Sequence, residues 1–448
     1  MKKFFFSWFA LTLLAVVILY WPSFTTFFTN DDFYFLNISK ANNIFEFAEF
    51  FNPFVRHEGQ AMYRPLTTQV FYFFGNSILN KNHIVMHILS FVGFAILIYL
   101  IYLFAYKLSN NKKISILTAF LYATSAIHFG HLYYLATFQE IGVAIFIFLS
   151  LIFYLEKKYR LTLISFILGL MSKETAVIIP PLLILVSVFL KKIEIKKIIP
   201  FALILFIYII IRLKFYGLAQ GESYIWDFSG RVVNTLAWYG LWSLNIPESF
   251  VDFIGPGFRI NPNLFTYWKE EAIQIFSIFI ILVFLLAVQV KSLKYKFFLF
   301  NFYFFVLSLM PVLFLPLHKF SYYLTVPLFA VVFVVANLIT KSNKLVRLGV
   351  VILWLTGSMI ALNYTKDTHW ITNGAKISLR TKNYFDNYKH KGEIALVDTQ
   401  DDNNLPWSPK EVVINAISGQ DFFSIFYDNK LILNDNGNKV PARQFLGY

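Results

Sequence analysis

Long apolar runs are the feature of this sequence that most restricts how it can fold. About 20 apolar residues cross a bilayer as an α-helix, and the chain contains many runs close to that length. Of its 448 residues, 58% are hydrophobic and 14% are charged, whereas an ordinary soluble domain is roughly 45–50% apolar and about 25% charged. The sequence therefore predicts a polytopic membrane protein and excludes a soluble globular domain.

Eleven membrane spans are predicted from these runs. The first, residues 4–20, follows Lys2 and Lys3 and lacks a small-residue cleavage site, so we interpret it as a retained span. Residues 231–246 are also apolar, but a twelfth span there would invert the basic loops that follow, and we expect a helix at the membrane interface instead. The other ten predicted spans are 83–106, 114–130, 139–155, 160–171, 175–190, 197–216, 272–290, 297–317, 321–340 and 345–363.

The distribution of basic residues predicts the orientation. Lys and Arg in short loops resist translocation and accumulate on the cytoplasmic side. With the N-terminus inside, the inner segments hold 18 Lys and Arg residues against two acids; these segments are 1–3, 107–113, 156–160, 191–197, 291–296 and 341–347. We therefore expect a multi-pass protein of the plasma (inner) membrane with a cytoplasmic N-terminus.

The net charge of +14 and the lack of cysteine restrict the partners and the chemistry. Because the basic residues lie in short clusters between apolar runs, the charge indicates orientation, and we predict no nucleic-acid partner. Without cysteine, disulfides, thiolate catalysis and cysteine-ligated metal centres are excluded. Any chemistry must use oxygen and nitrogen side chains.

The predicted domain boundary lies near Asn363, where the composition becomes polar. We expect residues 1–363 to form the transmembrane domain, with long outer loops at 22–82 and 217–271. Residues 364–448 are expected to form a small extracytoplasmic α/β domain. Its predicted elements are helices at 370–389 and 409–418 and strands at 393–398 and 430–434. The predicted fold class is thus an all-α membrane bundle with an α/β appendage.

Ionisable residues gather in the predicted outer segments, where a cluster at one depth favours a functional site. Asp31 and Asp32 directly follow the first span; they are either solvated loop acids or a general base. His57 lies in the same loop. Arg64 precedes Pro65, and its guanidinium fork suits a phosphate or a pairing with a loop acid.

Other outer segments add further candidates. His128, His131 and Glu140 are nitrogen and oxygen ligands that would suit a divalent metal, although hydrogen-bonded structural histidines are the commoner case. Lys173 and Glu174 form a basic–acidic turn between two apolar runs. This pair is either a solvated turn or part of a site.

Two more basic residues lie near the predicted outer boundary of the membrane, where the positive-inside rule predicts few. Arg212 ends the seventh predicted span, and Lys319 lies between the ninth and the tenth. Cations near the outer boundary need a reason, and binding an anionic lipid head group is one.

Read together, these segments resemble the GT-C superfamily of membrane glycosyltransferases, and within it the protein O-mannosyltransferases with tetratricopeptide repeats and their bacterial relatives. The matching motifs follow the family order over residues 1–363; they are Asp31-Asp32, Tyr63-Arg64-Pro65-Leu66, His128–x–x–His131, Ser172-Lys173-Glu174, Arg212 and Tyr322-Tyr323-Leu324. The family's histidine pattern in the second span is kept only at His83, and its C-terminal repeats are absent.

The resemblance implies an active site on the non-cytoplasmic side, a polyprenyl-phosphate-sugar donor from the bilayer and a first-loop acid as the base. Asp31 or Asp32 would take the proton of the attacking hydroxyl in an inverting reaction. Arg64, Lys173, Arg212 and Lys319 would stabilise the leaving phosphate. The sugar and the acceptor, whether protein, lipid or glycan, stay open, as does a need for metal.

Two other classes use similar membrane segments. A transporter or flippase for lipid-linked sugars usually places ionisable residues near mid-membrane, often in two related halves, whereas these spans are nearly free of charge. An O-antigen polymerase or ligase would more typically feature paired arginines in a large outer loop. The glycosyltransferase is the favoured hypothesis.

Overall fold

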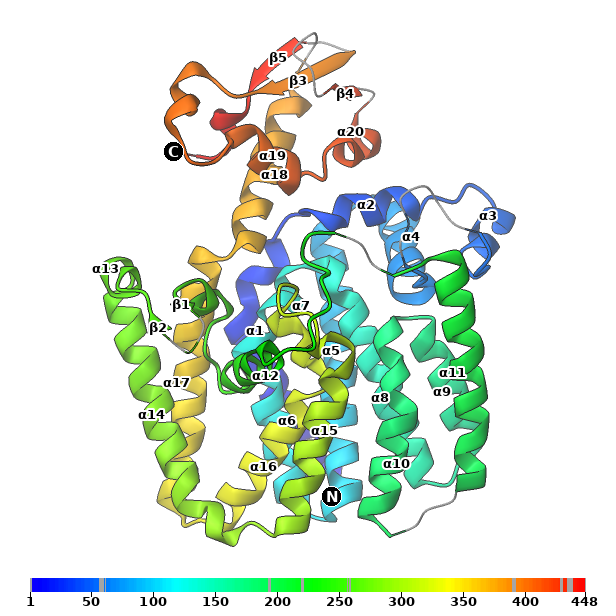
Figure 1. Cartoon of the computed structure of the whole chain (residues 1–448), viewed down its shortest axis with the longest axis vertical. Coiled ribbons are helices and arrows are strands. Elements are labelled where there is room, and N and C mark those ends of the chain that lie inside the picture. The colour runs from blue at the N-terminus through cyan, green and yellow to red at the C-terminus, as the bar shows by residue number, and fades with distance from the viewer. Residues whose placement is uncertain are drawn as a thin grey trace.

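The computed structural model is a helical bundle with a small α/β unit at one end (Figure 1). The structure describes residues 2–55, 60, 62–191, 195–218, 221–255, 257, 259–388, 392–427, 430–432 and 438–447.

The bundle contains seven helices that are long and apolar enough to cross a membrane. They are α1 (Lys2–Tyr20), α5 (His83–Ser109), α8 (Phe138–Leu155), α11 (Ile195–Phe215), α14 (Lys269–Gln289), α15 (Tyr295–Leu313) and α17 (Lys344–Thr368). The chain is therefore a multi-pass membrane protein.

Four shorter helices complete the set of eleven predicted runs. They are α6 (Lys112–Ala123), α9 (Tyr159–Leu170), α10 (Ile179–Phe189) and α16 (Leu328–Lys341). With 11–14 residues each, they are shorter than the ~20 residues that a helical span needs on its own. A helix thus occupies each predicted run, while the count of eleven spans stays a prediction.

Asparagine residues set three helix boundaries, two of them in the first short basic loop. At the far end of α5, the side chain of Asn82 accepts a hydrogen bond from the amide of Val85 and caps the start of the helix. In the loop, Asn110 ends α5 with a positive φ of 48°, a conformation that asparagine tolerates better than most residues. The side chain of Asn111 then caps the start of α6. The turn between α5 and α6 is therefore encoded locally.

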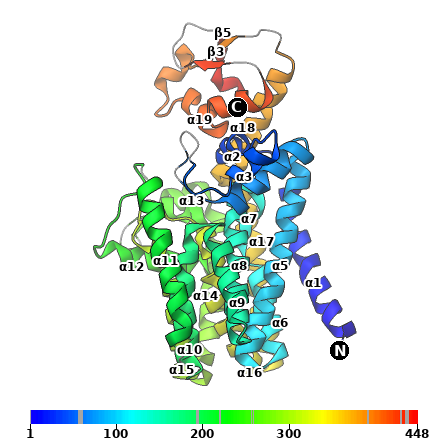
Figure 2. The same ribbon diagram turned by 90° about the vertical axis from the view of Figure 1, so that its right-hand side faces the viewer.

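The longer connections gather at the end of the bundle nearest the α/β unit (Figures 1 and 2). The helices there are α2 (Asp31–Ile38), α3 (Ile44–Glu49), α4 (Phe71–Phe73), α7 (Phe129–Tyr133), α12 (Arg231–Trp242) and α13 (Asn263–Tyr267). A short antiparallel pair, β1 (Ile254–Gly255) and β2 (Arg259–Ile260), lies in the same region. The segments predicted as outer loops thus share one end.

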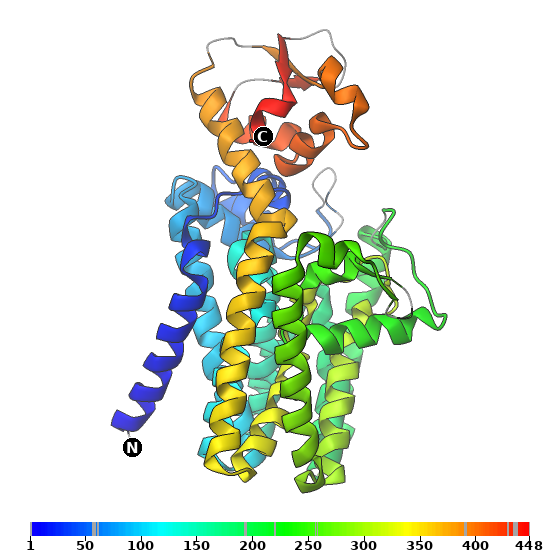
Figure 3. The same ribbon diagram turned by 90° about the vertical axis from the view of Figure 1, so that its left-hand side faces the viewer.

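Helix α12 corresponds to the apolar segment that we expected at the interface. It has 12 residues and runs across the bundle instead of along it (Figures 1 and 3). Trp238 and Trp242 are buried on its inner side. The length and direction of α12 agree with an interfacial helix.

The C-terminal unit begins where α17 gives way to α18 (Trp370–Asp386), which rises out of the bundle (Figure 3). A three-stranded parallel sheet with the order β4-β3-β5 follows; its strands are β3 (Glu393–Val397), β4 (Lys430–Ile432) and β5 (Asn438–Pro441). Helices α19 (Pro409–Ala416) and α20 (Gln420–Phe426) cover it. The sequence analysis missed α20 and wrongly took the strand at 430–434 as the last one.

An aromatic cluster joins this unit to the first loop. Phe33 of α2 packs edge-on against Phe422 of α20, with ring centroids 5.3 Å apart. Asn37 donates a hydrogen bond of 2.9 Å to Asp421. The helix that begins with Asp31 is therefore held between the bundle and the C-terminal unit.

Candidate active site

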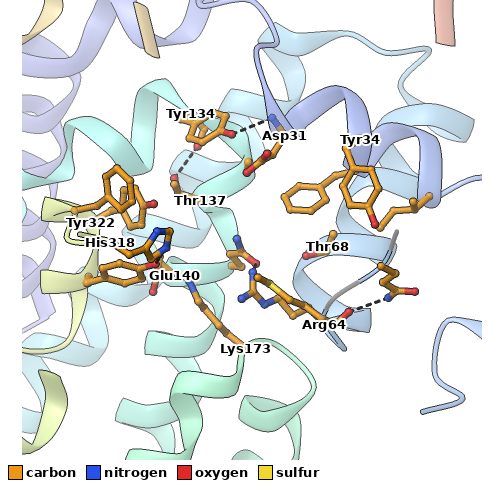
Figure 4. A pocket seen from close by; sticks show the side chains of 18 of the residues that line it. Asp31, Tyr34, Arg64, Thr68, Tyr134, Thr137, Glu140, Lys173, His318 and Tyr322 are labelled. Carbon is orange, nitrogen blue, oxygen red and sulfur yellow. Dashed lines mark hydrogen bonds and ion pairs between the residues drawn. The ribbon is translucent and has the colours of Figure 1, made fainter. Parts of the chain in front are cut away.

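A cavity of about 340 Å³ lies where the long loops meet; we call it the central cavity. Its walls come from α2, from residues 60–69, from the turn before α8 and from the segments around Lys173 and His318 (Figure 4). Its ionisable lining residues are Asp31, Tyr34, Arg64, Tyr134, Glu140, Lys173, Tyr224, His318, Tyr322 and Tyr323. The fold thus brings together groups that are up to 292 positions apart, from Asp31 to Tyr323.

Asp31 is the first residue of α2 and faces the cavity, across from Arg64 and Lys173 (Figure 4). Its backbone amide donates a hydrogen bond of 3.1 Å to the hydroxyl of Tyr134. Its side chain is accessible to solvent in the open cavity. The protein around it still weakens its hydration and raises the pKa of the Asp31 carboxyl group, while Tyr134 and the charge of Arg64 act in the opposite direction. Asp31 is therefore a stronger base than an aspartate in water.

Asp32 points away from the cavity and is only 1% exposed. Its carboxylate oxygens accept hydrogen bonds from the hydroxyl of Tyr72 (2.6 Å) and from the amide of Thr29 (3.0 Å). Burial raises its pKa to about 7, although both hydrogen bonds lower it. Asp32 therefore fixes the start of α2 and is not placed to meet a ligand in the cavity.

Arg64 lines the cavity from the segment before Pro65. Its Nε atom donates to Glu174 at 2.8 Å, a second donor of the guanidinium group pairs with the other oxygen of Glu174, and Nη1 donates to Gln139. Glu174 itself is not a lining residue. The bidentate pair orients the planar fork of Arg64 at the cavity wall.

Lys173 and Glu140 form a second ion pair, and both line the cavity. The ammonium group of Lys173 also lies 5.1 Å from the centre of the Tyr323 ring, within the range of a cation–π contact. Burial lowers the pKa of Lys173, and the charge of Glu140 counteracts that effect. Lys173 is thus a buried cation with a fixed position.

His318 directly precedes Lys319 in the sequence and was not selected as a candidate, yet it is His318 that lines the cavity. Its Nε2 atom lies 2.9 Å from the hydroxyl of Tyr323 and its Nδ1 atom 3.2 Å from Ser223. Burial lowers the pKa of His318 to about 4, and the charges of Lys173 and Arg64 act in the same direction. His318 is therefore neutral at pH 7.

Two predicted cations are not among the lining residues of the cavity. The ammonium group of Lys319 donates to the carbonyl oxygen of Pro316 at 2.9 Å. Arg212 donates to the carbonyl oxygen of Gly217 at 2.7 Å and caps the end of α11. It lines a separate apolar groove of about 170 Å³ together with Tyr63 and Tyr208.

His128 and His131, the two histidines considered as metal ligands, form hydrogen bonds within the protein instead. Their Nδ1 atoms lie 3.1 Å apart, so one donates to the other. On the outer sides, the Nε2 atom of His128 lies 2.8 Å from the carbonyl oxygen of Tyr122, and that of His131 lies 2.6 Å from the hydroxyl of Thr325. Every ring nitrogen therefore has a partner within the protein, and neither ring lines the cavity.

Among the described residues, no group of three or more His, Cys, Asp or Glu residues is placed to hold a metal ion. His57 lies outside the described residues. The cavity nevertheless holds several residues that the sequence analysis did not select, including Tyr134, Tyr224 and Trp370. In a chain in which 20% of the residues are aromatic, nothing in the sequence marks these three.

The arrangement offers two cations, Arg64 and Lys173, and two carboxylates to a ligand in a partly closed space. Of the carboxylates, Glu140 is paired with Lys173, whereas Asp31 faces the cavity. Asp31 can accept a proton, and Arg64 and Lys173 can stabilise negative charge. No family model matches the sequence, and no curated protein or solved structure matches the chain.

Proposed function

We propose that this chain is an integral membrane glycosyltransferase that moves a sugar from a polyprenyl-phosphate donor to an acceptor hydroxyl. The observation that carries the proposal is the central cavity, which Asp31 shares with Arg64 and Lys173. A sugar transfer of this kind needs a base at the attacking hydroxyl and positive charge at the departing phosphate. The cavity supplies both.

Asp31 is the proposed base, in preference to Asp32. The acceptor hydroxyl attacks the anomeric carbon as its proton passes to Asp31, and the bond from that carbon to the phosphate oxygen breaks. The electron pair leaves with the polyprenyl phosphate, and the configuration inverts. The raised pKa of Asp31 favours this role, because a base works best when its pKa approaches the working pH.

Arg64 and Lys173 are the proposed partners of the phosphate. A guanidinium group has five N–H donors and an ammonium group three. Arg64 uses three of them on Glu174 and Gln139, and Lys173 uses one on Glu140. Both therefore keep donors for a phosphate while their carboxylate partners hold them in place.

The apolar groove beside α11 suits the lipid part of the donor. It is lined by isoleucines of α9 and α11, and its neighbour Tyr63 directly precedes Arg64. Arg212 lies at the same groove, as a cation near a lipid head group would. We propose that the isoprenoid chain lies there and that its phosphate reaches the central cavity.

In this proposal the chain spans the plasma membrane eleven times with a cytoplasmic N-terminus. The short basic loops and the cavity end lie at opposite ends of the bundle (Figure 1). The positive-inside rule then places the cavity and the C-terminal unit on the extracytoplasmic side.

The test is sugar transfer by purified protein from a panel of radiolabelled polyprenyl-phosphate sugars. Asp31→Asn is the test variant, and Asp401→Asn, at an exposed position of the C-terminal unit, is the matched control. We expect activity in the wild type and the control, and loss of activity in Asp31→Asn with unchanged purification behaviour.

Two outcomes would end the assignment. One is full activity of Asp31→Asn. The other is no use of any donor by the wild type, with lipid-linked sugar crossing the bilayer of reconstituted vesicles instead; that result would identify a flippase.

A further inference from the structure

A second hollow lies between the bundle and the C-terminal unit, and nothing in the proposed reaction has used it so far. It is an open groove of about 690 Å³, which we call the tail groove. Its volume falls within the ~300–1,000 Å³ typical of sites for small molecules. Its lining residues are Asn30, Asp367, Thr368, Trp370, Asn373, Gly374, Lys376, Ile377, Arg380, Trp407, Val412, Asn415, Ala416 and Leu446.

One wall of the tail groove is a single face of α18. Trp370, Asn373, Lys376 and Arg380 follow one another at intervals of three, three and four residues, so their side chains project from the same side of the helix. Hydrophobic side chains on the other side of α18, such as Ile371 and Ala375, are buried and do not line the groove. The polar stripe therefore faces the groove and not the core.

The opposite wall carries a second indole and a free amide. Both indole rings are accessible to a ligand, because Trp407 is 40% exposed and Trp370 is 39% exposed. The side chain of Asn415 has no hydrogen-bond partner among the described residues, and neither has that of Lys376. Donors and acceptors are thus available between two aromatic surfaces.

The tail groove lies next to the proposed base. Trp370 lines both the tail groove and the central cavity. Asn30 lines the groove and directly precedes Asp31. The backbone amide of Asn30 donates a hydrogen bond of 2.7 Å to the carbonyl oxygen of Ala416. A molecule held along α18 would therefore end beside the carboxylate of Asp31.

The groove chemistry fits a saccharide. Indole rings pack against the C–H faces of a sugar ring, and amide, ammonium and carboxylate groups bind its hydroxyl groups. A protein partner would instead need a wider apolar surface with few charges at its centre. We propose that the tail groove binds the acceptor, an oligosaccharide or the glycan part of a glycolipid, and presents one of its hydroxyl groups to Asp31.

The role as an acceptor site rests on the proposed function, while saccharide binding does not. The first experiment therefore measures binding alone. Purified full-length protein is titrated into fluorescently labelled di- to tetrasaccharides of glucose, galactose, mannose and N-acetylglucosamine, and anisotropy is recorded. The variants are Trp407→Ala and Asn415→Ala, which leave the central cavity untouched. Trp226→Ala is the control, because Trp226 is 45% exposed and lines neither hollow.

We expect the wild type to bind at least one series. Trp407→Ala should weaken that binding about tenfold, the size of one aromatic packing contact. Asn415→Ala should weaken it less, and Trp226→Ala should leave it unchanged. The proposal is overturned if the wild type binds none of these saccharides, if both groove variants bind like the wild type, or if random peptides occupy the groove instead.

The second experiment separates this inference from the proposed function. Donor hydrolysis by water, without an acceptor, needs the central cavity only. Trp407→Ala should keep this hydrolysis and lose transfer to the saccharide that binds. If the wild type binds the saccharide through Trp407 but consumes no donor, the tail groove stands and the proposed glycosyltransferase falls.

Discussion

The two ends of the bundle use the same residue types in different surroundings. At the end with the short loops, Lys107 and Lys158 both contact Glu156, and the three side chains are between 28% and 55% exposed. At the cavity end, the side chains of Lys173 and Glu140 are 6% and 5% exposed. Charge at the first end is solvated, whereas charge at the second is held inside the protein.

This difference separates the charges that orient the chain in the membrane from the charges that belong to a site. An exposed ion pair contributes little to stability, so the basic loops need only their total charge to orient the chain. A buried ion pair has lost its hydration and rarely stabilises a fold by itself. The buried pair Lys173–Glu140 and the half-buried pair Arg64–Glu174, whose cation lines the same cavity, therefore indicate a site where fixed charge is needed.

The largest effect should follow from removing the base at the cavity end. Asp31→Asn should lower the rate of sugar transfer by about 10²–10⁴-fold, the usual contribution of a general base. Initial rates with a saturating donor would measure it. If the rate fell by less than threefold, Asp31 would not be a general base. The main functional contrast between the two ends of the bundle would then be lost.

The next effect concerns stability. Glu140→Gln leaves the charge of Lys173 buried without its partner, which should lower the free energy of unfolding by roughly 3–5 kcal/mol. Chemical unfolding in detergent, followed by tryptophan fluorescence, would measure the change. If the free energy of unfolding fell by less than about 1 kcal/mol, as at an exposed ion pair, water would have to reach Lys173 freely.

A pH effect should come from Asp32. Because burial raises its pKa from 3.8 to about 7, the folded chain holds a proton that the unfolded chain has released over this range. The contribution of Asp32 to the free energy of unfolding should therefore fall as the pH rises from about 4 to 7, by at most about 1.4 kcal/mol per pH unit. Buried histidines such as His318, whose pKa is lowered to about 4, contribute a slope of the opposite sign over part of this range. Asp32→Asn should remove the contribution of Asp32 alone, so stability should rise more steeply with pH in the variant than in the wild type.

The difference between the two slopes is the decisive point, because it isolates Asp32 from the other titrating groups. Unfolding titrations at several pH values between 4 and 7 compare the wild type with Asp32→Asn. The same slope in both proteins, or a slope that is more positive in the wild type, would contradict the burial of a protonated Asp32.

The smallest effect is expected at the opposite end. Glu156→Gln removes the acid between Lys107 and Lys158, yet the free energy of unfolding should fall by less than about 1 kcal/mol, because the pairs are exposed. It is the matched control for Glu140→Gln in the same unfolding assay. A loss of 3 kcal/mol or more would erase the contrast between the two ends.

Much of the fold follows from local signals. Each predicted apolar run contains a helix, and asparagine caps end α5 and begin α6 where the composition changes. In the C-terminal unit the signals are weaker, and α20 and β5 were missed. Helix α20 has seven residues and depends on packing with α2, so its own sequence gives little helical signal.

For the candidate site, the sequence located single residues but not their grouping. Asp31, Arg64, Glu140 and Lys173 were selected from their positions in outer segments, and all four line one cavity. Arg212 and Lys319 had the same kind of signal but lie elsewhere, because backbone carbonyl oxygens hold them. No local sequence pattern distinguishes a basic residue that donates to a backbone carbonyl oxygen from one that lines a cavity.

Asp31 and Asp32 show the limit most clearly. They are neighbours of one type, but successive residues of a helix point about 100° apart. At the start of α2, that rotation turns Asp31 toward the cavity and Asp32 toward Tyr72 and Thr29. Which carboxylate meets a ligand depends on what packs around α2.

The sequence by itself determined that this chain is a multi-pass membrane protein, because long apolar runs can satisfy their backbone groups in a bilayer only as helices. It also predicted a boundary near Asn363, since polar composition cannot continue through lipid; in the structure α17 continues to Thr368, and the C-terminal unit follows with α18. Only the tertiary structure decided which charged residues share a cavity and that Trp370 and Trp407 border one groove. These groupings depend on contacts between segments far apart in the chain, and no local sequence pattern encodes them.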